Sequence, residues 1–120
     1  MKNILIVDDE ESMRLLLRDL LEKDYNISLA SNGKEALSSL ARSSFDLIIT
    51  DLLMPEMGGI ELIIAFKNNV AGQKILAMSG GGRHSRYDYL PTVTLLGADK
   101  VFSKPFQLDK LKTAVNSMLS

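Results

Sequence analysis

Five polar residues have the types and positions to do chemistry together, although they are spread over most of the 120-residue chain. They are Asp8, Asp9, Asp51, Ser79 and Lys104, and each follows a short apolar run directly or within a few residues. In open α/β sheets the binding crevice lies beyond the carboxyl ends of the strands. If the apolar runs are parallel strands, these five side chains converge on one edge of a sheet.

Their chemistry is that of a phosphoacceptor. Crowded carboxylates repel one another unless a cation lies among them, and hard oxygen ligands without His or Cys suit Mg²⁺. A carboxylate can also attack phosphorus and form an aspartyl phosphate, with Mg²⁺ and fixed donors stabilising the developing charge. Lys104 supplies a point charge and Ser79 a hydroxyl donor. We therefore predict phosphorylation of Asp51.

Each of these residues also has an ordinary interpretation. Asp51 alone would fit a strand-end turn, and the acidic run from Asp8 to Glu11 would fit the first turn of a helix. Lys104 would fit a solvated loop, and Ser79, before glycines, would fit turn chemistry. Their convergence favours a site for Asp51, the aspartates and the lysine. His84, the single histidine, is expected to lie solvated in a polar loop.

The elements that position these residues follow from the apolar pattern. The runs lack strict alternation, as is typical of parallel strands covered on both faces. The predicted strands are Ile4 to Val7, Ile27 to Ala30, Leu47 to Thr50 and Ile75 to Met78, with a weaker fifth at Val101 to Phe102. Strands that alternate with helical segments indicate a doubly wound α/β domain.

About five helices are expected between and after these strands. Four have apolar faces at helical spacing: Met13, Leu16, Leu17, Leu20 and Leu21; Ala36, Leu37, Leu40 and Ala41; Ile60, Ile63 and Ile64; and Leu108, Leu111, Val115 and Met118. Ser31 or Asn32 is expected to cap the second helix. A further helix is predicted to begin near Asp88, because Pro91 is tolerated only in a first turn.

The totals exclude several classes of protein. The net charge of −1 gives no footprint for nucleic acid, and the absence of cysteine excludes disulfides and thiolate metal sites. The opening "MKNILIVDDEE" lacks the long apolar stretch of a signal peptide, and no apolar run reaches the length of a membrane span. We therefore expect a cytoplasmic protein that contacts neither membrane nor nucleic acid.

With these residues placed, the chain resembles the receiver (phosphoacceptor) domain of two-component response regulators. Four segments carry the resemblance along essentially the whole chain: "ILIVDDEESMR", "DLIITDLLMPEMGGIEL", "MSGG" and "GADKVFSKPF". The resemblance implies one receiver domain over residues 1–120, with the flavodoxin-like architecture of a five-stranded, doubly wound parallel sheet.

The resemblance also implies the metal ligands. Asp51 would accept the phosphoryl group and contact Mg²⁺, Asp9 would ligate Mg²⁺ directly, and Asp8 would act largely through metal-bound water. The backbone carbonyl of Leu53 would complete the protein's share of the metal shell.

The same resemblance assigns the remaining roles and shows departures, among them one at the position three residues before the lysine. Lys104 would pair with the phosphoryl group, Ser79 would move to bond it, and the peptide bond from Lys104 to Pro105 would be cis. Many family members carry an aromatic ring three residues before the lysine, whereas this chain has Val101. Phe102 is expected to face the opposite side of its strand and not to replace that ring.

The expected function is a phosphorylation-controlled signalling module, either stand-alone or part of a longer chain. A sensor histidine kinase or phosphotransfer protein would supply the phosphoryl group, and a downstream protein target would read the result. The chain would not be a turnover enzyme, although it would catalyse its own phosphorylation and dephosphorylation. One alternative is a degenerate receiver that acts without phosphorylation. Another, a small Mg²⁺ phosphatase, is disfavoured because Leu53 stands where a second acid would be needed.

Overall fold

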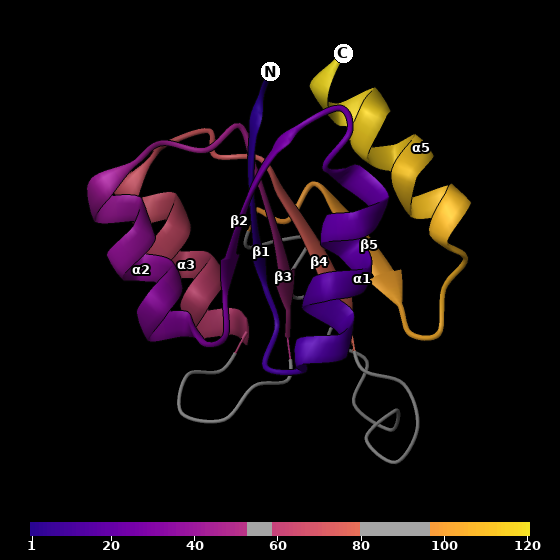
Figure 1. Ribbon diagram of the computed structural model, residues 1–120. Coiled ribbons are helices and arrows are strands. Elements are labelled where there is room, and N and C mark those ends of the chain that lie inside the picture. Colours follow the sequence, from indigo (N-terminus) through magenta and orange to yellow (C-terminus); the bar gives the residue numbers. More distant parts are fainter. Residues whose placement is uncertain (53–58, 80–96) are drawn as a thin grey trace.

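The computed structural model describes residues 1–52, 59–79 and 97–120 (Figure 1). These residues form five strands and four helices. The strands are β1 (Asn3–Val7), β2 (Asn26–Ala30), β3 (Leu47–Asp51), β4 (Ile75–Ser79) and β5 (Lys100–Ser103). The helices are α1 (Glu11–Leu21), α2 (Gly33–Arg42), α3 (Gly59–Asn69) and α5 (Leu108–Leu119).

The five strands form one parallel sheet in the order β2-β1-β3-β4-β5. This order confirms the predicted doubly wound α/β fold, and all five strands lie where the apolar runs predicted them. The helix expected to begin near Asp88 lies outside the described residues. The C-terminal ends of the strands lie together at one end of the sheet, and both chain termini lie at the opposite end (Figure 1).

Helices cover both faces of the sheet, with α2 and α3 on one face and α1 and α5 on the other (Figure 1). Successive strand residues alternate between these two layers because side chains along a strand point to opposite faces. Leu5 and Val7 of β1 pack in the layer with α2 and α3, whereas Ile4 and Ile6 pack in the layer with α1 and α5. Burial on both faces explains the continuous apolar runs in the sequence.

The predicted apolar faces of three helices were wrong at single positions. Leu16 of α1 is 43% exposed and Ile64 of α3 is 42% exposed, and Ala41 of α2 is exposed as well. In α1 the buried residues are Leu17 and Leu21, four residues apart, and Leu16 lies about 100° around the helix from Leu17. Spacing alone gave too wide a stripe, because the sheet covers only part of each helix surface.

The amino-terminal end of α2 is capped by two side chains. Asn32 is the N-cap residue, and its Oδ1 accepts a hydrogen bond from the backbone N–H of Glu35 at 2.8 Å. In return, the Glu35 carboxylate accepts bonds from the backbone N–H and the hydroxyl of Ser31, both at 2.6 Å. The bond to Asn32 satisfies a donor that the first turn of a helix leaves unpaired, and the bonds from Ser31 tie the preceding residue to the same turn. They confirm that the turn after β2 serves as a cap.

Two aspartates form hydrogen bonds at the end of the sheet where the strands begin. Asp46, just before β3, accepts a bond from the N–H of Asn3 at 2.7 Å and donates its own N–H to the carbonyl of Asn3. Asp99, just before β5, makes the same pair of bonds with Ile75 of β4. Each aspartate therefore extends the hydrogen bonding of the sheet by one residue.

Among the described residues, no helix combines the length and the hydrophobicity that a membrane crossing requires.

Candidate functional site

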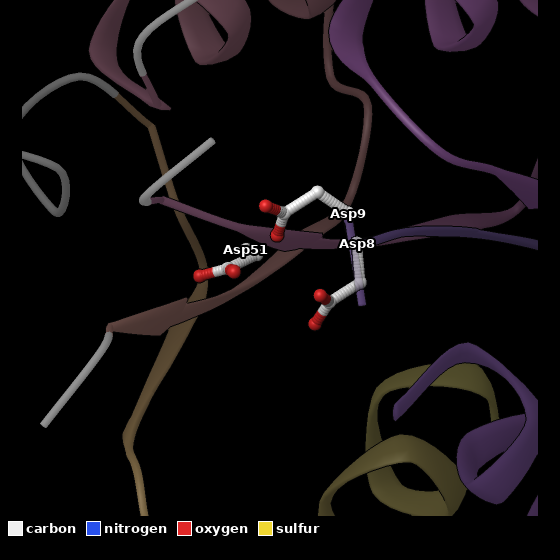
Figure 2. Close-up of side chains that lie close together, drawn as sticks. All are labelled: Asp8, Asp9 and Asp51. Atoms are coloured by element: carbon white, nitrogen blue, oxygen red, sulfur yellow. The ribbon is translucent and has the colours of Figure 1, made fainter. Parts of the chain in front are cut away.

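Three carboxylates lie together at the end of the sheet that is formed by the C-terminal ends of the strands. Asp51 is the last residue of β3, and Asp8 and Asp9 follow β1, the strand hydrogen-bonded beside it. One carboxylate oxygen of each residue lies within 4.8 Å of those of the other two. Figure 2 shows the three side chains close together. Asp8 and Asp51 are buried and Asp9 is exposed. Adjacent parallel strands that end together explain why residues 42 positions apart in sequence (9 to 51) become neighbours.

Lys104 reaches this cluster from the end of β5, the outermost strand beyond β4. It follows β5, and its Nζ lies 3.2 Å from Asp8 Oδ2 and 3.3 Å from Asp51 Oδ2. The peptide bond between Lys104 and Pro105 is cis, in agreement with the expectation from the sequence resemblance. One ammonium therefore bridges the two buried carboxylates, while three carboxylates still outnumber it. Among the residues that the structure describes, the cluster therefore holds three carboxylates and one ammonium, a balance that favours a bound cation.

Burial and charge compete at these groups. Burial raises the pKa of the Asp8 carboxyl above its ordinary value, because the hydrogen bond from the Glu10 N–H and the charge of Lys104 only partly offset the lost solvation. Burial alone would lower the pKa of the Lys104 ammonium, but the charges of Asp51 and Asp8 outweigh it and raise that pKa. Lys104 thus stays charged at neutral pH and supplies a fixed positive group.

Ser79 lies at the same end of the sheet, as the last residue of β4. Its hydroxyl lies 3.4 Å from the hydroxyl of Ser103, and its carbonyl accepts the N–H of Lys104 at 2.9 Å. No role was predicted for Ser103, although it directly precedes Lys104. The structure thus joins the ends of β4 and β5 at the two residues that were predicted to contact a phosphoryl group.

The turn between β1 and α1 holds the acid pair in place. The N–H of Glu10 donates to Asp8 Oδ1 at 2.9 Å, and Arg14 Nη1 donates to the backbone carbonyl of Asp8 at 2.7 Å. No function was predicted for Arg14 from the sequence. That contact joins residues six positions apart in the folded turn, so no local sequence pattern indicated it.

Some predicted positions cannot be placed. Leu53, whose backbone carbonyl was expected to ligate the metal, and His84, expected to be solvated, lie outside the described residues. The other predicted site residues, Asp8, Asp9, Asp51 and Lys104, are brought together, and Ser79 lies at the end of the next strand.

Phe102 and Val101 face opposite layers, as their neighbouring positions predicted. Val101 packs in the layer of α2 and α3, and Phe102 packs in the layer of α1 and α5. The ring of Phe102 meets that of Phe106 edge to face, with centroids 5.7 Å apart at 77°. Phe102 therefore does not occupy the place of an aromatic ring at position 101.

The donor set suits a hard divalent cation. The acids Asp8, Asp9 and Asp51 offer only carboxylate oxygens, and the sequence has no cysteine that could contribute a thiolate. Oxygen-only ligands of this kind are typical of Mg²⁺ sites, in which one or two carboxylates bind together with waters and a phosphate. The cluster could therefore hold a metal ion beside the Asp51 carboxylate.

Comparisons with known proteins agree with this geometry. Residues 4–116 match the response regulator receiver domain. The chain is 34% identical to the chemotaxis protein CheY of Halobacterium salinarum over 120 residues, which cover 99% of this chain and 98% of that protein. The chain is also 35% identical to histidine kinase P4 of Formosa agariphila. That match covers 97% of this chain but only 8% of the kinase.

A solved structure is similar along the whole chain. The response regulator TrrA of Thermotoga maritima, solved in complex with Mg²⁺ and BeF, superimposes with a TM-score of 0.83 at 34% identity. The match covers 98% of this chain and 99% of that one.

A doubly wound α/β fold with an acidic cluster and a lysine at its carboxyl edge defines the class of protein. The chain belongs to the response regulator receiver domain family, the receivers of two-component systems. This confirms the resemblance that the four sequence segments indicated.

Proposed function

We propose that Asp51 accepts a phosphoryl group and that residues 1–120 act as a single phosphorylation-controlled receiver domain. The observation that carries this proposal is the double ion pair of Lys104 with the carboxylates of Asp8 and Asp51, beside the exposed carboxylate of Asp9. A nucleophilic carboxylate, a fixed cation and a candidate metal site thus lie within a few ångströms of one another. Phosphoryl transfer requires this combination, because positioning and charge stabilisation account for most of its catalysis.

The donor is a phosphohistidine on a sensor histidine kinase or phosphotransfer protein. An oxygen of the Asp51 carboxylate attacks the phosphorus, and the P–N bond breaks. The electron pair of that bond stays on the imidazole, which takes up a proton. Hydrolysis later reverses the state of Asp51: water attacks the phosphorus, the P–O bond to the carboxylate breaks, and inorganic phosphate leaves. The chain is thus modified and restored, and it does not turn over a separate substrate.

Lys104 stabilises the charge that develops on the phosphoryl oxygens. Before transfer its ammonium lies 3.3 Å from Asp51 Oδ2, so a phosphoryl group on Asp51 would arrive beside an existing positive charge. Ser79, at the end of the neighbouring strand, would donate its hydroxyl to the same group after leaving the hydroxyl of Ser103. Asp51 acts as nucleophile, and Lys104 and Ser79 act as stabilising donors.

Mg²⁺ is the cofactor that best fits the oxygen-only donors. Asp8, Asp9 and Asp51 would hold it, with the carbonyl of Leu53 as a fourth protein ligand that the family resemblance supplies. When bound, it would neutralise the excess of carboxylate charge and the charge of the phosphoryl oxygens. The similarity to TrrA, which was solved with Mg²⁺ and BeF, supports this assignment.

The proposal is tested by weighing the intact protein after incubation with acetyl phosphate and Mg²⁺. Wild-type protein should gain the mass of one phosphoryl group, and the gain should vanish without Mg²⁺ and in Asp51→Asn. Asp109→Asn serves as the matched control, because it removes an exposed aspartate of α5 that is not one of the three clustered acids and should gain the same mass as wild type. No mass gain in wild type, or an equal gain in Asp51→Asn, would overturn the proposal.

A further inference from the structure

Arg14 makes a contact that the proposed chemistry leaves unexplained. It lies in α1, is half-buried, and donates from Nη1 to the backbone carbonyl of Asp8 at 2.7 Å. That distance is at the short end of the range for N–H···O bonds, as expected when the donor carries a charge. The bond spans six residues and ties α1 back to the end of β1.

The carbonyl that Arg14 holds belongs to the peptide unit joining Asp8 and Asp9. A peptide unit is planar, so fixing its carbonyl direction restricts how the Cα atoms on both sides are turned. Asp8 is further fixed by its own N–H, which donates to the carbonyl of Ala30, and by the bond from the Glu10 N–H to its carboxylate. Asp9 is exposed, so its orientation depends more on this peptide unit.

We propose that Arg14 is a positioning residue for divalent-cation binding: it holds the peptide between Asp8 and Asp9 so that both carboxylates face Asp51. This inference rests on the proposed function, since it concerns the metal that the acid cluster would hold. Arg14 does not itself ligate the cation. Partners that orient metal ligands from outside the ligand shell commonly change metal affinity by about 10-fold or more when they are removed.

Charge and geometry predict opposite results at this position. A positive charge near a cation site weakens cation binding. If Arg14 acted only through its charge, its removal should therefore tighten the binding of Mg²⁺. Loss of positioning should weaken it instead, because the acid pair would sample orientations that do not face Asp51. The sign of the net change therefore shows which of the two effects is the larger at this position.

The test is calorimetric titration of Mg²⁺ into wild type, Arg14→Gln, Arg14→Lys and Arg18→Gln. Arg18 is the matched control, because it lies one turn further along α1 and pairs only with Asp19 and Glu22 among the contacts described for it. We expect Arg14→Gln to raise the dissociation constant of Mg²⁺ about 10-fold. Arg14→Lys, which keeps the charge and one donor group, should fall between it and wild type, and Arg18→Gln should match wild type.

A second readout separates positioning from a merely structural role. In phosphorylation by acetyl phosphate, Arg14→Gln should need more Mg²⁺ for half-maximal rate and should still approach the wild-type rate at saturating Mg²⁺. Equal or tighter Mg²⁺ binding by Arg14→Gln overturns the inference. If Arg14→Gln does not fold, Arg14→Lys decides, and a wild-type dissociation constant in that variant overturns it. Failure of wild type itself to bind Mg²⁺ would instead contradict the proposed function.

Discussion

At Asp8, solvation and charge act in opposite directions on one carboxyl group. Its side chain is fully buried, and the ammonium of Lys104 at 3.2 Å compensates for only part of the lost hydration. The pKa of Asp8 is therefore raised, and its ionised form destabilises the fold in the absence of a cation. The buried, ionised carboxylate of Asp8 thus lowers the stability of the metal-free fold, and its oxygens are among those that could hold a metal ion.

Asp8→Asn should raise the free energy of unfolding of the metal-free protein at pH 7. The folded-state pKa of Asp8 lies above its unfolded value of 3.8, so the folded protein binds the proton more tightly than the unfolded chain. The destabilising contribution is therefore present above the raised folded pKa and disappears below the unfolded pKa. Urea denaturation without Mg²⁺ should show the gain at neutral pH and a smaller gain near pH 4. A loss of stability in Asp8→Asn at pH 7 would contradict this account.

At the scale of elements, the helix caps and strand ends set where each site residue emerges. Asn32 caps α2 shortly after β2, and the carboxylate of Glu35 in its first turn bonds Ser31 and is not one of the three clustered acids. Asp46 and Asp99 fix the starts of the strands that they precede, β3 and β5, whose other ends carry Asp51 and lead to Lys104. The register of these strands therefore determines whether Asp51 and Lys104 meet.

Asn32→Ala should lower the free energy of unfolding by about 1 kcal/mol, because the N–H of Glu35 loses its cap. Asn68→Ala is the matched control, since Asn68 is an exposed residue near the end of α3. Urea denaturation should show a loss for Asn32→Ala and a change within about 0.5 kcal/mol for Asn68→Ala. Equal stabilities for the two variants would show that the cap contributes nothing.

Asp99→Ala should cost about 1 kcal/mol as well, because the N–H of Ile75 at the start of β4 loses its side-chain acceptor. Asp99→Asn keeps an amide oxygen in the same place and should retain most of the stability. Thermal or urea denaturation of the two variants gives the comparison. If Asn and Ala at position 99 destabilise alike, the hydrogen bond to Ile75 is not what stabilises this end of the sheet.

The sequence predicted the residues of the site better than the contacts that hold them. The five strands and the convergence of Asp8, Asp9, Asp51 and Lys104 followed from apolar runs and from the rule that parallel strands end at one edge. The exposure of Leu16 did not follow, because spacing gives the direction of a side chain and not the area that the sheet covers. The bonds of Arg14 and Asp99 join residues 6 and 24 positions apart and depend on the folded register, which no local pattern encodes.

At the scale of the whole molecule, the neighbouring residues Val101 and Phe102 of β5 pack in different layers of the core. Val101 packs with the layer of α2 and α3, and Phe102 packs against Phe106 in the layer of α1 and α5. A ring that swings at position 101 is thus absent from this chain. We expect phosphorylation to be read through changes at the ends of β4 and β5, where Ser79 and Ser103 meet.

Mg²⁺ should stabilise the whole fold through the acid cluster. A ligand that binds only the folded state at 100 times its dissociation constant adds about 2.7 kcal/mol to the free energy of unfolding. Wild type should therefore gain stability on addition of Mg²⁺, Asp9→Asn and Asp51→Asn should gain much less, and Asp109→Asn should match wild type. Denaturation at several Mg²⁺ concentrations provides the measurement. No gain in wild type would favour a degenerate receiver that acts without phosphorylation.

The most direct test of the central claim is to locate the phosphoryl group. Acyl phosphates are reduced by borohydride to alcohols, so a phosphorylated aspartate is converted to homoserine and can be found by peptide mass spectrometry. After treatment with acetyl phosphate, Mg²⁺ and borohydride, the account predicts homoserine at position 51. Homoserine at another acidic residue, or at none, would contradict it.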